Sequence, residues 1–192
     1  MKNIIKQLFF ALFAFIALPF TLLYFCLLLV LNKNDCIALF SQLLSLFPGK
    51  SGSLLRAGFY RFTLTNCSKD ALISFGTILS QQDTSIGSGV YIGPQCNIGM
   101  CNIEQDVILG SGVHIMSGAK QHEFTDTTRP IRDQGGAFTS VKIGRNSWIG
   151  NGALIMADIG KNAVVAAGSV VISPVPDKSI VAGNPAKVLK TL

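Results

Sequence analysis

A six-residue repeat in the C-terminal two-thirds of the chain constrains the fold more than any other feature of the sequence. Each unit starts with an aliphatic residue, usually followed by glycine, and a small residue stands four places after the aliphatic one, as Val90 does after Ile86. The register slips by one residue before Ile103 and then resumes. A pattern that stays in phase over many units indicates a solenoid of stacked repeats. The units begin at Ile86, Ile92, Ile98, Ile103, Leu109, Ile115, Ile143, Ile149, Ile159 and Val165.

Three such units make one triangular coil of about eighteen residues, and the strands of successive coils pair in parallel about 4.8 Å apart. We expect the aliphatic and the small residue of each unit to fill the interior, and the glycine to permit the tight corner. One coil cannot bury its own core, so several must stack, and residues 73–173 provide about five or six. The sequence therefore predicts a mainly β protein, a parallel β-helix of hexapeptide repeats.

A polar segment interrupts the repeat between Ala119 and Val141. Long polar loops that leave a rigid scaffold are usually functional. His122, one of only two histidines in the chain, stands near the start of this segment. We therefore predict that residues 120–140 form a protruding loop of functional importance.

The segment from Leu8 to Leu31 contains no charged residue, and about 20 apolar residues suffice for a helix to cross a bilayer. A helix over this segment would be apolar on every face, whereas a helix that packs on a soluble core usually has a polar face. The segment also lacks the short apolar region and small-residue cleavage site of a signal peptide. We predict that residues 1–31 are inserted in a membrane. Pro19 should kink or break the helix, which leaves two topologies open: a single kinked span, or a re-entrant hairpin around Pro19 with both ends on one side.

Residues 32–69 are predicted to form short amphipathic helices, because apolar residues there alternate with Arg56 and Arg61. Two placements are open for these helices. They lie at the membrane surface with their arginines near lipid phosphates, or they pack on the domain that follows. That domain is assigned to residues 70–173, and residues 174–192 form a C-terminal tail.

Composition excludes several other classes of protein. The chain is 49% hydrophobic and only 14% charged, the opposite of a disordered sequence. The net charge is +6, but the basic residues are scattered, so we expect no nucleic-acid binding; an anionic lipid or a phosphorylated ligand suits this balance better. The five cysteines are odd in number and lack CxxC spacing, so neither a disulfide framework nor a zinc site is expected. Two histidines are too few for a three-histidine zinc site, and we predict no metal.

Four features point to a known family: the Ile-Gly ladder, the run Val113–Ile115 leading to His122 and Asp126, the sequence 148–150 (Trp-Ile-Gly), and the tail 181–188. Over residues 73–190 the chain resembles the hexapeptide-repeat acyltransferases, in particular the maltose/galactoside and xenobiotic acetyltransferase branch. The resemblance implies a left-handed β-helix, a homotrimer and acetyl-CoA as acyl donor. The membrane segment and the short turn at 155–158 depart from the soluble members, so their acceptors are not transferred to this chain.

The resemblance also implies roles for individual residues. His122 would be the general base, a task suited to imidazole with its ordinary pKa of about 6.5. From the residue types alone, Asp126 or Glu123 would orient its ring. Arg129 and Arg132 would either hold an anionic acceptor or only solvate the loop. Asn97 would bind the acceptor, although asparagine at a solenoid corner also has purely structural uses. The other histidine, His114, is expected at the surface or lining a groove. Acetyl-CoA would lie in a groove between neighbouring prisms, contacted by Trp148, Gly150, Ala166, Gly168 and, at its phosphates, Lys187.

The sequence thus predicts a membrane-anchored O-acetyltransferase whose acceptor is a sugar hydroxyl of a surface-polysaccharide or lipid-linked glycan precursor. Because acetyl-CoA is cytoplasmic, the expected location is the inner (cytoplasmic) membrane, with the catalytic domain facing the cytoplasm. Two alternatives stay open: a non-catalytic membrane scaffold, and an acyltransferase that uses acyl carrier protein to modify lipid or an amino sugar.

Overall fold

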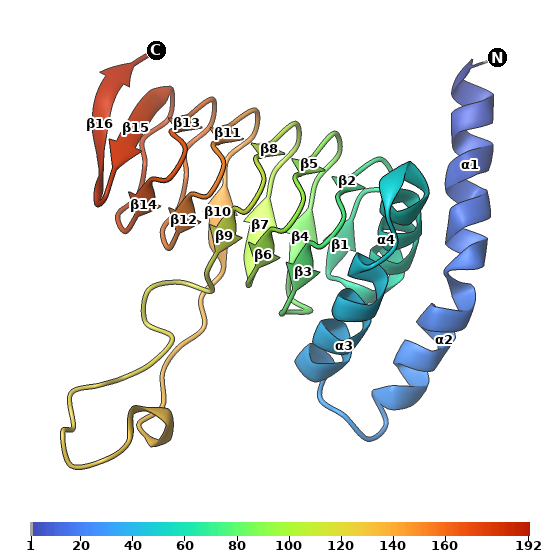
Figure 1. Cartoon of the computed structure of the whole chain (residues 1–192), viewed down its shortest axis with the longest axis horizontal. Helices are drawn as coiled ribbons and strands as arrows, with labels where there is room; N and C mark the ends of the chain where they lie inside the picture. Colours follow the sequence, from blue (N-terminus) through green and yellow to red (C-terminus); the bar gives the residue numbers. More distant parts are fainter. Residues whose placement is uncertain (1) are drawn as a thin grey trace.

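The computed structural model describes residues 2–192, which form a parallel β-solenoid with a group of helices at its N-terminal end (Figure 1). The chain winds through three sheets in turn, and the six parallel strands of the second sheet mark six coils. This confirms the mainly β, hexapeptide-repeat fold predicted from the sequence. The strands of the first sheet are β1 (Asn66–Cys67), β4 (Ser85–Ile86), β7 (Cys101–Ile103) and β10 (Val141–Ile143). Those of the second are β2 (Leu72–Ile73), β5 (Tyr91–Ile92), β8 (Ile108–Leu109), β11 (Trp148–Ile149), β13 (Val164–Val165), β15 (Ser179–Gly183) and the antiparallel β16 (Ala186–Thr191). Those of the third are β3 (Ile78–Leu79), β6 (Asn97–Ile98), β9 (His114–Ile115), β12 (Leu154–Ile155) and β14 (Val170–Val171).

The interior of the prism is filled as the repeat predicts. The aliphatic residue that starts each unit is buried, and in most units so is the small residue four places later, as at Ile86 and Val90 or at Ile149 and Ala153. The exceptions follow Ile98, where the register slips, and Ile115, where the loop begins and Ala119 is exposed. Close packing of one aliphatic and one small side chain per unit builds a continuous core along the stack.

The glycine at the second position of the unit has a different role from the expected one. A Cβ on Gly150 would lie 2.4 Å from the backbone nitrogen of Ala167 in the next coil, and one on Gly87 would lie 2.8 Å from that of Gln105. The left-handed backbone of the corner occurs instead two places later, as at Gly152 with φ of 68°. Glycine at the second position is therefore needed for the close approach of successive coils, and the expectation that it forms the corner was wrong.

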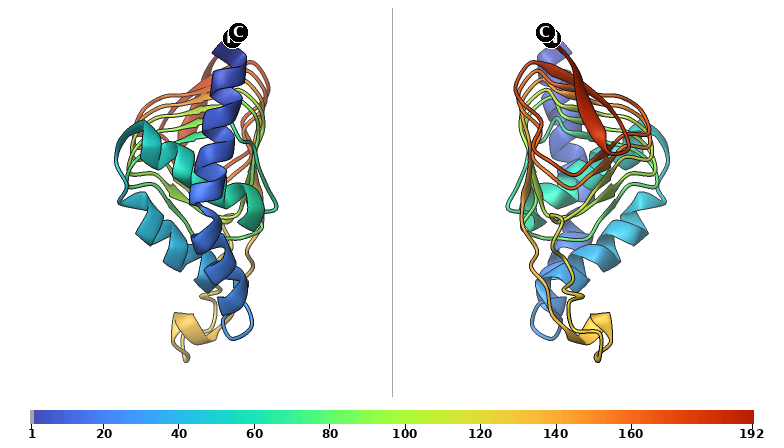
Figure 2. Two further views of the ribbon diagram at one scale, coloured as in Figure 1. Left: turned by 90° about the vertical axis from the view of Figure 1, so that its right-hand side faces the viewer. Right: turned by 90° about the vertical axis from the view of Figure 1, so that its left-hand side faces the viewer.

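Four helices cover the N-terminal end of the prism. They are α1 (Lys2–Ile16), α2 (Leu18–Leu27), α3 (Lys33–Ser45) and α4 (Gly49–Thr63). Pro19 lies in the first turn of α2, where its missing N–H is tolerated, and the break between α1 and α2 falls at Ala17. Viewed along the stack, α1 and α2 run across the end of the prism (Figure 2).

Helices α3 and α4 pack on the first coil, as one of the two placements left open by the sequence requires. The Ser53 hydroxyl accepts a hydrogen bond from the Ile73 N–H (3.0 Å), and the Ser41 hydroxyl accepts one from the Leu79 N–H (2.6 Å). These side chains satisfy backbone groups at the edges of the second and third sheets, which have no preceding coil to pair with.

Arg56 is buried in the cap that α3 and α4 form on the first coil, so of the two placements considered for it, the one beside lipid phosphates does not hold. Its side chain has no exposed surface. Nε donates to the Ile73 carbonyl (2.9 Å), and Nη1 donates to the carbonyls of Leu44 and Phe47 (both 2.8 Å). The arginine thus joins the C-terminal end of α3 and the residues after it to the first coil. Burial lowers the pKa of the guanidinium from its ordinary value.

Candidate active site

The outer face of the third sheet carries a polar hollow between coils. Asn97 of β6 pairs in register with His114 of β9, and His114 pairs with Leu154 of β12. The hollow has a volume of about 280 Å³, close to the lower end of the range for small-molecule sites. It is lined by Ser80, Asn97, Gly99, His114, Ile115, Met116, Ser117, Gln121 and Leu154.

His122 stands at the base of the protruding loop, immediately after a residue that lines this hollow. The two sides of the base pair through their backbones: the Ala137 N–H donates to the Lys120 carbonyl (2.8 Å), and the Glu123 N–H donates to the Gly135 carbonyl (3.1 Å). The side chain of His122 is exposed. The histidine is therefore held by a hydrogen-bonded ribbon while its ring is open to a ligand.

Two further candidate residues of the loop, Asp126 and Arg129, lie farther along it and form hydrogen bonds within the loop. The Asp126 carboxylate accepts hydrogen bonds from the backbone N–H (2.9 Å) and the hydroxyl (2.6 Å) of Thr128. These two bonds hold the pKa of Asp126 below its ordinary value. The Arg129 guanidinium donates to the Asp133 carbonyl. Within residues 2–192, neither Asp126 nor Arg129 forms a hydrogen bond with His122, so a role in orienting or binding remains a prediction.

The residues expected to bind coenzyme A occupy other faces of the prism. Trp148 lies on the second sheet, in register with Ile108 and Val164, and is 55% exposed. Gly150, Ala166 and Gly168 lie along the edge where the chain passes from the second sheet to the third, and Lys187 is on β16. In one protomer, therefore, Trp148 and the hollow beside Asn97 face outward from different sheets.

Buried thiols do not contribute a nucleophile here. Burial raises the pKa of Cys67 and of Cys101 to about 12, and it also raises the pKa of Cys96. A thiol with so high a pKa forms almost no thiolate near neutral pH. The chemistry of the hollow therefore depends on imidazole, amide and hydroxyl groups.

Of the residues that line the hollow, the sequence analysis named Asn97 and His114 and missed the others. His114 stands one coil after Asn97, at the same outward strand position, so the coil period itself brings the two side chains together. Gln121 and Ser117 could not be placed in this way, because they follow the point where the repeat ends and the loop begins.

No protein-family model and no curated protein matches the sequence significantly. Solved structures are similar in fold. A maltose O-acetyltransferase from Clostridium difficile has a TM-score of 0.70 at 22% identity, over 84% of this chain and 87% of that one. The fold is that of the hexapeptide-repeat acetyltransferases. A member from Vibrio cholerae gives a TM-score of 0.65 at 18% identity, over 85% and 94% of the two chains. An N-acyltransferase variant from Bacillus cereus, in complex with dTDP-4-amino-4,6-dideoxyglucose and coenzyme A, gives 0.53 at 16% identity, over 65% and 71%.

Proposed function

We propose that the protein is an acetyl-CoA-dependent O-acetyltransferase, and that its acceptor is a sugar hydroxyl of a surface-polysaccharide or lipid-linked glycan precursor. The observation that carries this proposal is the exposed His122, held by a paired loop base beside a polar hollow on the prism. The similar structures named above are acetyl- and acyltransferases, and one of them holds coenzyme A together with a sugar nucleotide.

In the proposed reaction, the neutral ring of His122 accepts the proton of the acceptor hydroxyl. The oxygen then forms a bond to the thioester carbonyl carbon, and a backbone N–H stabilises the negative charge that develops on the carbonyl oxygen. The carbon–sulfur bond breaks, and the proton passes from His122 to the departing thiolate of coenzyme A, which leaves as the thiol. Asn97 and His114, which line the hollow, would bind the acceptor.

We propose that the complete site forms between protomers of a homotrimer. Trp148 and the hollow lie on different faces, so they can act on one acetyl-CoA and one acceptor only if two copies supply them. An exposed apolar stripe on the second sheet supports a subunit interface there, because monomers rarely expose a continuous apolar face. The stripe consists of Leu72, Tyr91, Ile108 and Trp148, in register from coil to coil.

Membrane anchoring is proposed for the N-terminal segment. Lys6–Leu27 has a mean hydropathy of 2.3, is long enough to cross a bilayer and is only 17% buried. An anchor would hold enzyme and lipid-linked acceptor at one surface and raise their rate of encounter. We propose the inner membrane, with the prism in the cytoplasm where acetyl-CoA is available.

The test is mass spectrometry of glycans from cells with and without the protein, together with release of coenzyme A from acetyl-CoA by the purified protein. We expect acetylated sugars only in cells that contain the protein, and slow release of coenzyme A in the absence of acceptor. Identical glycans and no binding of acetyl-CoA would favour a scaffold instead.

Gly136 provides a test of the loop base. A Cβ at this residue would lie 2.0 Å from the Gln121 carbonyl oxygen and 2.9 Å from the Cα of His122, and φ is 150°. Gly136→Ala should therefore displace His122 and lower turnover by about tenfold to a hundredfold, the usual effect of a misplaced catalytic group. Thr127→Ala, at an exposed position of the same loop, is the control for both activity and thermal unfolding. Full activity in Gly136→Ala would contradict the proposed role of the loop base.

A further inference from the structure

The N-terminal helices are part of the folded body, which limits how they can meet a membrane. Gly58 of α4 approaches α1 closely: a Cβ there would lie 2.9 Å from the Phe13 carbonyl oxygen and 3.0 Å from the Cα of Ala14. In α2, Tyr24 is buried and its ring packs edge-on against Phe59, with centroids 5.8 Å apart. Separation of these helices from the cap would expose this close-packed contact.

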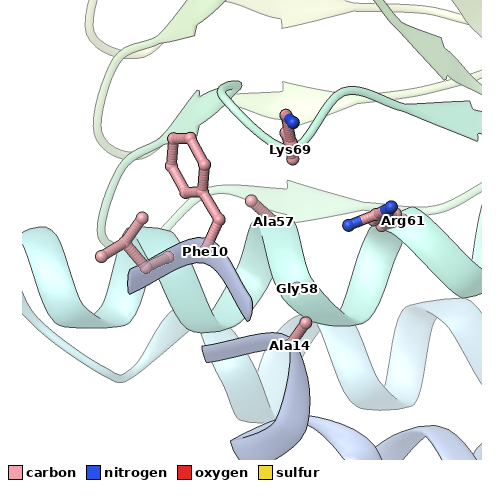
Figure 3. Close-up of a pocket in the computed structure, with 7 residues that line it drawn as sticks. Phe10, Ala14, Ala57, Gly58, Arg61 and Lys69 are labelled. Atoms are coloured by element: carbon pink, nitrogen blue, oxygen red, sulfur yellow. The ribbon is translucent and has the colours of Figure 1, made fainter. Parts of the chain in front are cut away.

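Where α1 packs against α4 and the first coil, two basic side chains of those elements lie beside it. Arg61 of α4 and Lys69 of the first coil lie next to Phe10 and Ala14, around a small cavity (Figure 3). The Lys69 ammonium donates to the side-chain carbonyl of Gln7 (2.7 Å). Ala14 is about 12 Å along the helix from Lys6 at 1.5 Å per residue. A docked helix that crossed a bilayer would therefore carry Arg61, beside Ala14, to hydrocarbon depth, where a charged group is strongly disfavoured. The Lys69 ammonium would stay near the level of Gln7.

The face of α1–α2 that points away from the cap is apolar over its whole length. Leu8, Phe15 and Leu22 recur at intervals of two helical turns and are each more than 60% exposed, and Leu29 continues the series just beyond α2. Cations flank this face: Lys6 and Lys50 line a second, apolar hollow of about 450 Å³ with Phe9. An apolar face with lysines beside it is typical of helices that lie at the surface of an anionic membrane.

We propose that α1–α2 remains docked on the cap and lies in the plane of an anionic phospholipid membrane, with the stacking axis of the prism pointing away from the bilayer. This inference rests on the proposed membrane anchoring and specifies its geometry. The helix pair runs across the end of the prism (Figure 2), so its apolar face meets the membrane while every coil stays in water. Both ends of the segment then lie on the same side of the membrane. This agrees with basic residues at both ends, Lys6 before the apolar segment and Lys33 and Lys50 after it.

The experiment measures the depth of the apolar face in vesicles of phosphatidylcholine and phosphatidylglycerol. Cys26 is the one exposed cysteine among residues 2–192, so Cys26→Ser provides a background for single labels. Leu8→Cys, Phe15→Cys, Leu22→Cys and Leu29→Cys each receive an environment-sensitive fluorophore, and quenching is compared for lipids with a nitroxide near the headgroup or deep in the acyl chain. Lys190→Cys, on the exposed face of β16 at the other end of the prism, is the control.

We expect stronger shallow than deep quenching at each labelled position of the helix face, with the same ratio throughout, and no quenching at Lys190→Cys. Deep quenching that peaks at Phe15→Cys and Leu22→Cys would mean a span or a re-entrant hairpin and would overturn the in-plane geometry while membrane anchoring survives. Absence of quenching at every position would overturn both. Circular dichroism of each labelled variant establishes that the fold is retained.

Discussion

Turnover of acetyl-CoA and acceptor should fall on the order of a hundredfold or more when His122 is replaced by alanine, because the acceptor hydroxyl then loses its general base. His122 is exposed and forms no side-chain hydrogen bond within residues 2–192, so the substitution should leave thermal unfolding unchanged. The measurement is release of coenzyme A at saturating concentrations of both substrates, which separates turnover from binding.

His114→Ala is the matched control, since it removes the other imidazole from the same side of the prism. His114 lines the hollow beside Asn97, so its loss should weaken acceptor binding more than turnover. If His114→Ala abolished turnover and His122→Ala retained the full rate, the base would be assigned to the wrong histidine.

The largest effect on stability is expected for Arg56→Leu. The substitution removes the donor that the carbonyls of Ile73, Leu44 and Phe47 share. The Leu44 carbonyl keeps a hydrogen bond from the Phe47 N–H (3.3 Å), whereas an acceptor that is left buried and unsatisfied costs about 1–3 kcal/mol. We therefore expect a loss of about 3 kcal/mol or more in the free energy of unfolding, measured by denaturant titration in detergent.

Arg61→Met is the control for charge. Arg61 lies on the same helix, with its guanidinium 5.7 Å from the centre of the Phe62 ring, and it holds no buried carbonyl. Its replacement should change stability by less than about 1 kcal/mol. Equal effects of the two substitutions would show that the buried hydrogen bonds of Arg56 contribute nothing specific.

Arg56 also illustrates why part of the structure was not predictable from the sequence. The repeat could be interpreted residue by residue, because a strand position fixes whether a side chain such as Ile92 points inward, whatever the rest of the chain does. The burial of Arg56 depends on carbonyls from the end of α3, the residues after it and the first coil. Nothing in the local alternation of Arg56 and Arg61 with apolar residues distinguishes the buried arginine from the exposed one.

In the candidate site, too, some positions follow from the repeat and others depend on contacts that the repeat does not determine. The proximity of Asn97 and His114 follows from the coil period. The position of His122 instead depends on a non-repetitive loop, in which Lys120 pairs with Ala137 and Glu123 pairs with Gly135. This pairing has no signature in the sequence. His122 and Trp148 belong to faces of the prism that point in different directions. In the proposed site they come together only when several copies assemble.

Different structures cover the two ends of the prism: helices at the N-terminal end and the antiparallel strand β16 at the C-terminal end. At one end, Ser41, Ser53 and Arg56 occupy backbone groups that another coil would otherwise use; at the other, β16 turns back along β15 in the opposite direction. A parallel stack with bare ends could grow by adding further chains, as fibrils do. The covered N-terminal end, together with β16 on the second sheet at the other end, disfavours stacking of copies end to end and leaves the sides of the prism as the surface for association.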